Sequence, residues 1–225
     1  MIVISTNNGQ KFLTNLLSDL VKHQCKLPIA IIDTQSTDEK SLEFLEALKH
    51  PTFNKLLNLS VHTTPGKNYD TGAYVYAINN LKAERYYFLH DSIRIKTPIM
   101  FSEIDKKLTP GTVVALTIFP GNCYDNNEQK ELCFKNWNTT LFKTGIFGPM
   151  FSILRSDLEK NWNKLPKILP INKNQQMGME RGWSVFCTKS KLDVVPLEEN
   201  PKHDKVFNDG FVHFTKILPK RNIND

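Results

Sequence analysis

Residues Tyr69 to Ile95, YDTGAYVYAINNLKAERYYFLHDSIRI, decide how the rest of the chain can be arranged. Apolar and small side chains recur at helical spacing over residues 73 to 81. The run Tyr86 to Leu89 is aromatic and apolar without alternation, which is typical of a strand covered on both faces. This run ends abruptly on polar residues, His90-Asp91-Ser92. The stretch therefore predicts a helix, a short break and a buried strand.

A carboxylate at the end of a buried strand has two interpretations. Ligands of open α/β sheets bind at the carboxyl ends of the strands, which makes Asp91 a candidate binding residue. Asp is also a common turn former, so Asp91 equally fits a residue that only ends the strand.

The remaining chain repeats the same order of elements. Residues 2 to 4 predict a strand followed by a helix over 12 to 20, and residues 29 to 32 predict a second strand followed by a helix over 42 to 48. This alternation predicts a parallel sheet with right-handed crossovers. Further strands are expected over 56 to 61, 112 to 118 and 192 to 197, and a helix over 156 to 165. Residues 121 to 138 have no clear periodicity and predict a loop, and a loop of this length in a compact domain is usually functional or mobile.

Composition places the chain among single-domain globular proteins. It has 225 residues, of which 40% are hydrophobic and 23% charged, enough for a substantial core. The net charge of +6 suits an anionic partner such as a nucleoside diphosphate, an acidic membrane surface or a nucleic acid. Because the 29 lysines and arginines are dispersed, a dedicated nucleic-acid groove is not expected.

The cysteine spacing and the amino-terminal sequence indicate in which cellular compartment the protein is expected. None of the four cysteines forms a CxxC pair, which predicts free thiols in a reducing compartment. Neither a secretory signal nor a membrane-spanning run is found, so we expect a cytoplasmic protein.

The helix, strand and terminal acid of the opening stretch resemble the centre of GT-A nucleotide-sugar glycosyltransferases, in the style of the large inverting family two. In that family the helix follows a polar-glycine element, matched here by residues 68 to 72. The strand ends on a DxD-type motif that holds a divalent metal against the nucleotide diphosphate, and this chain has one carboxylate there, Asp91. The resemblance implies a GT-A-like α/β fold, Rossmann-related, in which a central, mostly parallel sheet is flanked by helices within a single domain, 1–225.

A second motif points to the nucleoside. Residues 31 to 38 resemble the family's second-strand motif, V-D-N-x-S-T-D, whose first acid recognises the base or ribose. On that resemblance Asp33 is the nucleoside candidate, while Ser36 and Asp38 fix the loop. An ordinary interpretation stays open, in which Ser36, Thr37 or Asp38 caps the following helix.

Other positions near the nucleotide are implied by the same resemblance. The candidates are Ser5 and Thr6 after the first strand, Tyr69 or Asp70 together with Gly72 before the central helix, and His90. Gly72 fits equally well a glycine that is needed only for close packing.

Two further segments concern the acceptor. Residues 147 to 154 resemble the family's small-residue strand that borders the acceptor pocket, so a strand is expected there. Residues 177 to 186 resemble the family's acidic motif, in which an acid pair opens a helix and one acid is the general base. Glu180 matches one acid, and Arg181 replaces its neighbour. A base is needed because the attacking hydroxyl must lose its proton as the new bond forms. Glu180 near a helix start would equally fit an acid that stabilises the helix dipole.

The carboxyl-terminal tail supplies the last candidates. Several GT-A enzymes close the site with a histidine on the metal and a lysine on the diphosphate, and His213 and Lys216 are similar in type and spacing. The resemblance therefore implies Mn²⁺ or Mg²⁺ held by Asp91 and His213, with Lys216 on the diphosphate. A histidine beside Phe211 and Phe214 also fits a packed strand residue.

These resemblances imply a metal-assisted, inverting glycosyltransferase. A hexosyl or deoxyhexosyl group would move from a UDP-, GDP- or dTDP-linked sugar to a hydroxyl of a glycan or polysaccharide. Residues 1–97 would bind the nucleotide sugar and 98–225 the acceptor, with peripheral membrane contact left open. One alternative is a sugar nucleotidyltransferase, although its glycine-rich opening with a basic residue is missing after Ile4. The other is a non-catalytic sugar- or nucleotide-binding domain.

Overall fold

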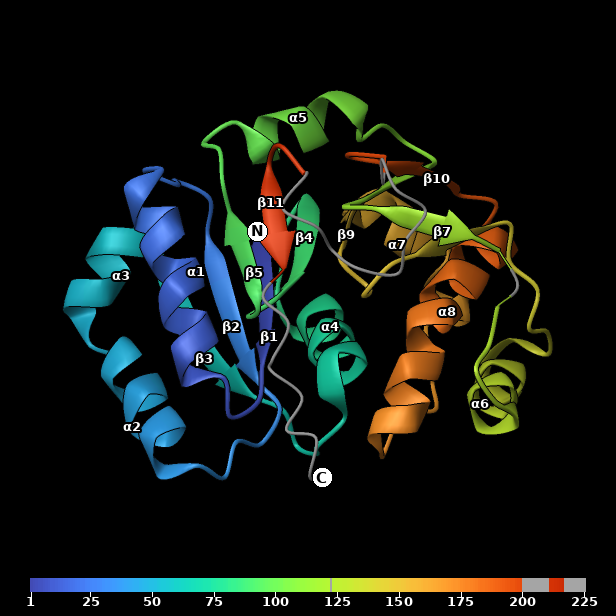
Figure 1. Cartoon of the computed structure of the whole chain (residues 1–225), viewed down its shortest axis with the longest axis horizontal. Helices are drawn as coiled ribbons and strands as arrows, with labels where there is room; N and C mark the ends of the chain where they lie inside the picture. Colours follow the sequence, from blue (N-terminus) through green and yellow to red (C-terminus); the bar gives the residue numbers. More distant parts are fainter. Residues whose placement is uncertain (122, 200–210, 217–225) are drawn as a thin grey trace.

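The structure is a computed structural model that describes residues 1–121, 123–199 and 211–216. A central sheet of seven strands organises this part of the chain (Figure 1). In spatial order the strands are β10 (Asp193–Pro196), β6 (Thr112–Ala115), β9 (Phe151–Leu154), β4 (Arg85–His90), β1 (Ile2–Thr6), β2 (Ile29–Asp33) and β3 (Leu59–Thr63). Strands β1 to β4 run parallel, as do β6 and β10, whereas β9 is antiparallel to β4 and β6. The predicted α/β fold with a mostly parallel sheet is confirmed.

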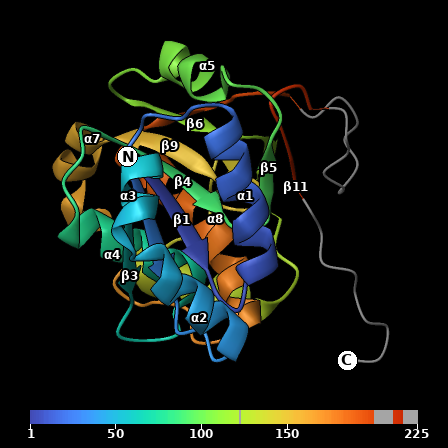
Figure 2. The same ribbon diagram turned by 90° about the vertical axis from the view of Figure 1, so that its left-hand side faces the viewer.

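Helices cover both faces of this sheet. One face packs against α1 (Gln10–Lys22), α2 (Glu39–Leu48), α3 (Pro51–Leu57) and α5 (Met100–Lys107). The other packs against α4 (Tyr69–Asn80), α6 (Asn127–Trp137), α7 (Arg155–Lys160) and α8 (Lys173–Ser190), and a 3-10 turn spans Trp162–Lys164. Figure 2 shows α1 and α4 on opposite sides of β1.

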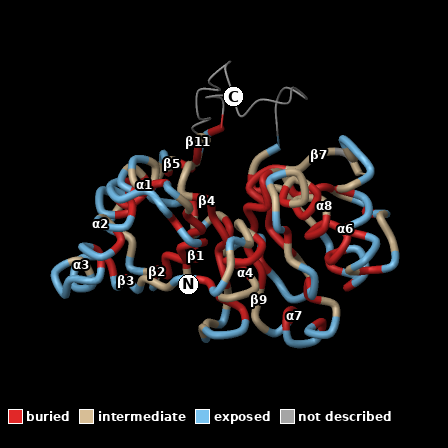
Figure 3. The backbone as a smooth tube through the Cα atoms, turned by 90° about the horizontal axis from the view of Figure 1, so that it is seen from below, coloured by how far each residue is buried: buried red, intermediate tan, exposed pale blue. Residues whose placement is uncertain are grey.

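Alternation along the strands explains why two apolar clusters form. In β1, Ile2 and Ile4 belong to the cluster with α1, and Val3 belongs to the cluster with α4. Successive side chains of a strand point to opposite faces, so a fully apolar strand supplies both layers. Strand β1 is buried throughout, and exposed positions gather on α2 and α3 (Figure 3).

Two small antiparallel pairs complete the described structure. Strand β5 (Ile93–Ile95) pairs with β11 (Phe214–Lys216), and β7 (Ile118–Pro120) pairs with β8 (Thr144–Ile146). The first pair brings the tail residue Lys216 opposite Ile93, just after the end of β4.

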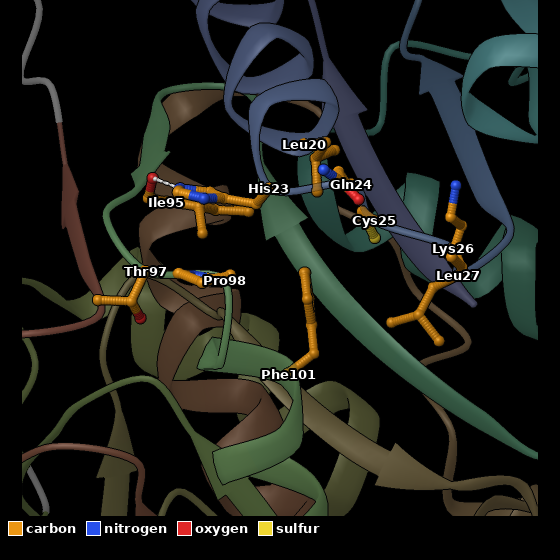
Figure 4. A pocket seen from close by; sticks show the side chains of 10 residues that line it. All are labelled: Leu20, His23, Gln24, Cys25, Lys26, Leu27, Ile95, Thr97, Pro98 and Phe101. Atoms are coloured by element: carbon orange, nitrogen blue, oxygen red, sulfur yellow. Dashed lines mark hydrogen bonds between the residues drawn. The ribbon is translucent and has the colours of Figure 1, made fainter.

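Hydrogen bonds of Asp19 and His23 attach strand β5 to α1 and to its carboxyl end. Both carboxylate oxygens of the buried Asp19 accept from Arg94, over 2.6 and 2.7 Å, and one also accepts from the Ile95 amide over 3.0 Å. At the end of α1, His23 Nε2 lies 3.0 Å from the Ile95 carbonyl, beside a pocket of about 190 Å³ that Phe101 also lines (Figure 4).

The predicted loop over residues 121 to 138 is wrong for its second half, which is helix α6. Asn126 caps this helix by accepting from the Gln129 amide, and the buried residues are Gln129, Leu132, Cys133 and Trp137. These four positions make one narrow stripe that packs on α8. The stripe begins with a glutamine, and the other helix positions are mostly polar, which hides the period in the sequence.

Three other predicted boundaries also differ. The strand expected over residues 56 to 61 begins at Leu59, because Pro51–Leu57 is a helix that ends at Asn58 in a left-handed conformation (φ 45°). The strands expected over 112 to 118 and over 147 to 154 are shorter, with β6 ending at Ala115 and β9 beginning at Phe151. Tertiary pairing determines these ends, which local propensity alone does not.

The described helices are too short or too polar for any of them to cross a membrane. None of the four cysteines, Cys25, Cys123, Cys133 and Cys187, takes part in a disulfide within the described structure.

Candidate active site

Three neighbouring strands deliver polar side chains to one edge of the sheet. In the parallel register Thr6 lies opposite Asp33, and Ser5 lies opposite His90. Asp91 follows directly after β4, and its amide donates to the Ser5 carbonyl over 3.1 Å. The carboxyl edge of a doubly wound sheet is where such folds bind ligands, so these predicted residues share the expected place.

Asp91 is held between β1 and the start of α1. Thr6 Oγ1 donates to Asp91 Oδ2 over 2.7 Å. The same oxygen lies against Gly9, since a Cβ there would come within 1.8 Å of it. Burial raises the pKa of Asp91 to about 7, against the lowering effect of the Thr6 hydrogen bond. A bound cation would oppose that rise, because it favours the charged carboxylate.

Asp70, a candidate together with Tyr69 in the sequence analysis, lies at the centre of the site. It belongs to the first turn of α4 and accepts from Ser5 Oγ on one oxygen and from Gln176 Nε2, over 3.1 Å, on the other. His90 Nε2 lies 3.3 Å from Asp70 Oδ2, an electrostatic contact too poorly aligned for a hydrogen bond. Burial acts to raise the pKa of Asp70, but His90 and Ser5 outweigh it, and the pKa is lowered.

His90 connects this carboxylate to the tail. Burial lowers its pKa to about 4, so the imidazole is neutral near pH 7. The second ring nitrogen, Nδ1, lies 3.5 Å from Lys216 Nζ. A neutral imidazole has one donor and one acceptor nitrogen, which suits a position between a carboxylate and an ammonium.

Lys216 brings a positive charge among three acids. Burial lowers its pKa, while the charges of Glu180, Asp70 and Asp91 act to raise it. An ammonium group in this position can neutralise further negative charge, such as that of a phosphate.

Glu180 lies inside α8 and not at its start. The helix begins at Lys173, so the alternative of a dipole-stabilising acid in the first turn is wrong. Burial raises the pKa of Glu180, against the charges of Lys216 and Arg181. A carboxylate with a raised pKa is a stronger base than an ordinary carboxylate, which suits proton abstraction.

Arg181 replaces the second acid of the motif. Its side chain contacts two backbone carbonyls and an aromatic ring. Its guanidinium donates to the carbonyls of Met177 and Cys123, over 2.9 and 3.3 Å, and lies 5.6 Å from the ring centre of Phe119. It therefore ties α8 to the segment that precedes α6.

The loop that follows Asp33 is ordered by hydrogen bonds between its own residues. Asp33 Oδ1 accepts from the Ser36 hydroxyl over 2.6 Å and from its amide over 3.0 Å, and Asp33 is only 2% exposed. Asn8 adds a second brace, since its side chain accepts from the amides of Thr37 and Asp38. Asp38 caps α2 by accepting from the Ser41 amide over 2.9 Å. The capping interpretation is therefore correct for Asp38, and Ser36 orders the loop.

Tyr69 and Gly72 begin α4 on either side of Asp70. Tyr69 has a left-handed backbone (φ 52°) and is partly exposed. Gly72 packs against Asn68, and a Cβ there would come within 2.3 Å of the Asn68 Cβ. Close packing is thus sufficient to explain this glycine.

His213 lies apart from the other predicted metal ligand. Its ring nitrogen Nδ1 is 2.7 Å from Thr97 Oγ1, and its carbonyl accepts from the Lys96 amide. Asp91 precedes the other end of β5, so the structure does not bring His213 together with Asp91. Among the described residues there is no cluster of three or more His, Cys, Asp or Glu side chains that could hold a metal ion.

The carboxylate at the site still fits a divalent cation that binds together with the phosphates of a substrate. Mg²⁺ is commonly held by one or two carboxylates together with substrate phosphates, without an all-protein cage. Asp91 is the described carboxylate at the expected position, so it is the residue that would hold such a metal.

Two further residues at the site were missed, Gln176 and Tyr74. Both are fully buried, and Gln176 precedes Glu180 by one helical turn, a spacing that could have flagged it. Burial raises the pKa of Tyr74, and the charges of Asp70, Asp91 and Glu180 act in the same direction. Tyr74 therefore stays protonated, as a donor close to the acids.

Comparison with known proteins was made on sequence and on structure. No protein-family model and no curated protein sequence matches the chain. Among solved structures, the mannosyltransferase PcManGT from Pyrobaculum calidifontis, in complex with GDP-Man and Mn²⁺, matches with a TM-score of 0.59 at 14% identity over 98% of this chain. GalNAc-T7 with UDP, GalNAc and Mn²⁺ matches with a TM-score of 0.53 at 15% identity over 80% of this chain. S. aureus TarS 1-349 gives 0.49 at 18% identity over 81%.

The likenesses to PcManGT and GalNAc-T7 show that this chain has the GT-A fold. The match covers 57% of the PcManGT chain and 40% of the GalNAc-T7 chain, and 55% of the TarS chain, so the protein spans less than two thirds of each. The predicted resemblance in fold is confirmed.

Proposed function

We propose that the protein is a glycosyltransferase that moves a sugar from a nucleoside diphosphate to an acceptor hydroxyl. The observation that carries the proposal is the convergence of Asp91, Asp70, Glu180 and Lys216 at the carboxyl edge of a GT-A sheet. A site in which the Lys216 ammonium lies among three acids suits a substrate that brings its own phosphates and a cation.

The nucleotide side belongs to residues 1–97. Asp33, ordered by Ser36, would meet the nucleoside, and Ser5, Thr6, Tyr69, Gly72 and His90 would surround the ribose and diphosphate. Asp91 would hold a divalent metal, Mn²⁺ or Mg²⁺, which when bound neutralises charge on the leaving diphosphate. Lys216 would add a second positive charge at the same phosphates.

The acceptor side belongs to residues 98–225. Glu180 would take the proton from the attacking hydroxyl of a glycan or polysaccharide. Direct attack on the anomeric carbon, opposite the leaving nucleotide, inverts its configuration. The transferred group would be a hexosyl or deoxyhexosyl unit from a UDP-, GDP- or dTDP-linked donor.

Calorimetric titration with UDP, GDP and dTDP, each with and without Mn²⁺, tests the donor half of the proposal. We expect one nucleotide to bind in a metal-dependent manner, and Asp91→Asn to weaken that binding. Ser92→Ala, a change at the next residue, is the matched control and should bind as the wild type does.

The same titration, together with an assay for turnover of the corresponding nucleotide sugars, separates the alternatives. Binding that ignores both the metal and Asp91 would overturn the metal assignment. Tight binding without turnover of any nucleotide sugar would support a non-catalytic binding domain. Absence of binding to all three nucleotides would contradict the proposed function.

A further inference from the structure

The hydrogen bond between Gln176 and Asp70 joins the two halves of the molecule. Gln176 lies on α8, and Asp70 lies in the first turn of α4; the two helices are in contact (Figure 1). Gln176 Nε2 donates to Asp70 Oδ2 over 3.1 Å, and the Gln176 side chain is completely buried. An uncharged amide that donates to a carboxylate makes a charge-assisted hydrogen bond, about twice as strong as a neutral one.

Asp70 is a firm anchor for this bond. Ser5 at the end of β1 donates to its other oxygen, and His90 of β4 approaches within 3.3 Å. Because both partners belong to central strands, the Asp70 carboxylate keeps a defined position relative to the edge where the nucleotide would bind.

An aromatic contact joins α4 and α8 in addition to the hydrogen bond between Gln176 and Asp70. Tyr74 of α4 and Trp183 of α8 pack with their ring centres 6.3 Å apart, and both are completely buried. Tyr74 lies one turn beyond Asp70, and Trp183 lies two turns beyond Gln176, so both pairs occupy facing sides of the same two helices.

Glu180 lies between these two contacts on α8. It follows Gln176 by four residues, and side chains at this spacing lie on the same side of a helix. A displacement of the first turns of α8 would therefore carry Glu180 with it.

We propose that Gln176 is a positioning residue for glycosyl transfer, which through Asp70 sets the distance between Glu180 and the bound nucleotide sugar. This inference rests on the proposed function of the site. Gln176 does not touch the reacting atoms; it aligns the base that does. A misplacement of about 1 Å is enough to reduce a reaction rate ~100-fold.

Three variants test the link. Gln176→Ala removes the amide, and Gln176→Glu places a second carboxylate against Asp70. The double variant Asp70→Asn with Gln176→Glu exchanges the two groups and restores an amide–carboxylate pair. Gln175→Ala is the matched control, because this neighbouring amide contacts Glu128 on α6, within the acceptor half, over 3.1 Å.

We expect Gln176→Ala to lower kcat for transfer about 10- to 100-fold while the nucleotide Kd stays within about twofold. The ratio of sugar transfer to hydrolysis by water should fall, which a purely structural loss would not cause. Gln176→Glu should be at least as impaired, and the exchanged pair should transfer sugar faster than Gln176→Glu. Unchanged transfer by Gln176→Ala, or an exchanged pair no better than Gln176→Glu, would overturn the proposal.

Amide hydrogen exchange supplies a measurement that does not depend on turnover. We expect the first turns of α4 and α8 to exchange faster in Gln176→Ala than in the wild type or Gln175→Ala. Equal exchange would overturn the link even if the enzyme is active. Failure of the wild type to bind any nucleotide would instead overturn the proposed function, and with it the positioning role, whatever the exchange rates.

Discussion

At the scale of single residues, Gly9 and Asp91 form one unit. The Asp91 carboxylate occupies the space beside Gly9, where an added Cβ would meet its Oδ2 at 1.8 Å and Thr6 Oγ1 at 2.7 Å. Any side chain at residue 9 must therefore displace the acid or the start of α1.

We expect Gly9→Ala to weaken metal-dependent nucleotide binding about tenfold or more, because Asp91 is pushed from its place. Calorimetric titration measures this, with Lys11→Ala, an exposed change on the same helix, as the control. Wild-type affinity in Gly9→Ala would show that nucleotide binding does not depend on this position of Asp91.

Asp91 also makes the stability of the ligand-free protein depend on pH. Burial raises its pKa from 3.8 to about 7, so the folded chain binds this proton more tightly than the unfolded chain does. Stability linked to Asp91 is therefore greatest at low pH and falls as pH rises from about 4 to about 7. Urea unfolding of the wild type and Asp91→Asn should show the variant gaining relative stability across this range. A pH-independent difference would contradict the raised pKa.

Glu180 gives the residue-scale prediction about chemistry. Its pKa is raised by burial, and a general base must be ionised, so kcat/KM should fall at acid pH with a midpoint above the ordinary 4.5. Glu180→Gln should lower kcat ~100-fold or more and leave the nucleotide affinity unchanged. Steady-state kinetics across pH measures both, and an unaltered kcat would remove Glu180 from the mechanism.

At the scale of elements, the position of Lys216 depends on how β5 is attached to α1. Asp19 is buried and holds Arg94 and the Ile95 amide, and β5 in turn pairs with β11, which carries Lys216. The attachment is therefore part of the support of the site although it lies outside it.

We expect Asp19→Ala to lower the free energy of unfolding by about 2 kcal/mol, because it removes hydrogen bonds to a charged group. Glu46→Ala breaks the exposed ion pair with Lys49 and should change the free energy of unfolding by less than about 0.5 kcal/mol. Urea unfolding compares the two, and equal losses would argue against a special role for Asp19.

The elements also show where local patterns were sufficient. Strands β1, β2 and β4 were predicted because an uninterrupted apolar run is distinctive when a strand is buried on both faces. Helix α6 was missed because its buried stripe is narrow and begins at Gln129, a polar residue that packs completely. The strand expected before residue 59 was misplaced because Pro51 opens a helix there.

At the scale of the whole molecule, the proposed ligand contacts come from strands, helices and a tail that meet only in the folded state. A ligand that binds only this state stabilises it, by about 2.7 kcal/mol at a concentration 100 times Kd. For a chain of this size that corresponds to roughly 5–10 °C in Tm.

We therefore expect the correct nucleotide, together with Mn²⁺, to raise the Tm of the protein by roughly 5–10 °C at saturation. Removal of the metal with a chelator should reduce the shift, and Asp91→Asn should abolish its metal-dependent part. Thermal unfolding with each nucleotide measures this, and identical Tm values for all of them would contradict a nucleotide site.

The sequence by itself determined strands β1, β2 and β4, the helices that follow β1 and β2, and the place of the acids at strand ends, because these follow from interactions over a few residues. Asp33 and Asp91 were found in this way, next to the apolar runs that they end. Only the tertiary structure decided which distant side chains meet. It joined Gln176 to Asp70, brought Lys216 to His90 and kept His213 away from Asp91. The physical reason is that helix packing and strand register set these contacts between residues far apart in the chain, and no local pattern records them.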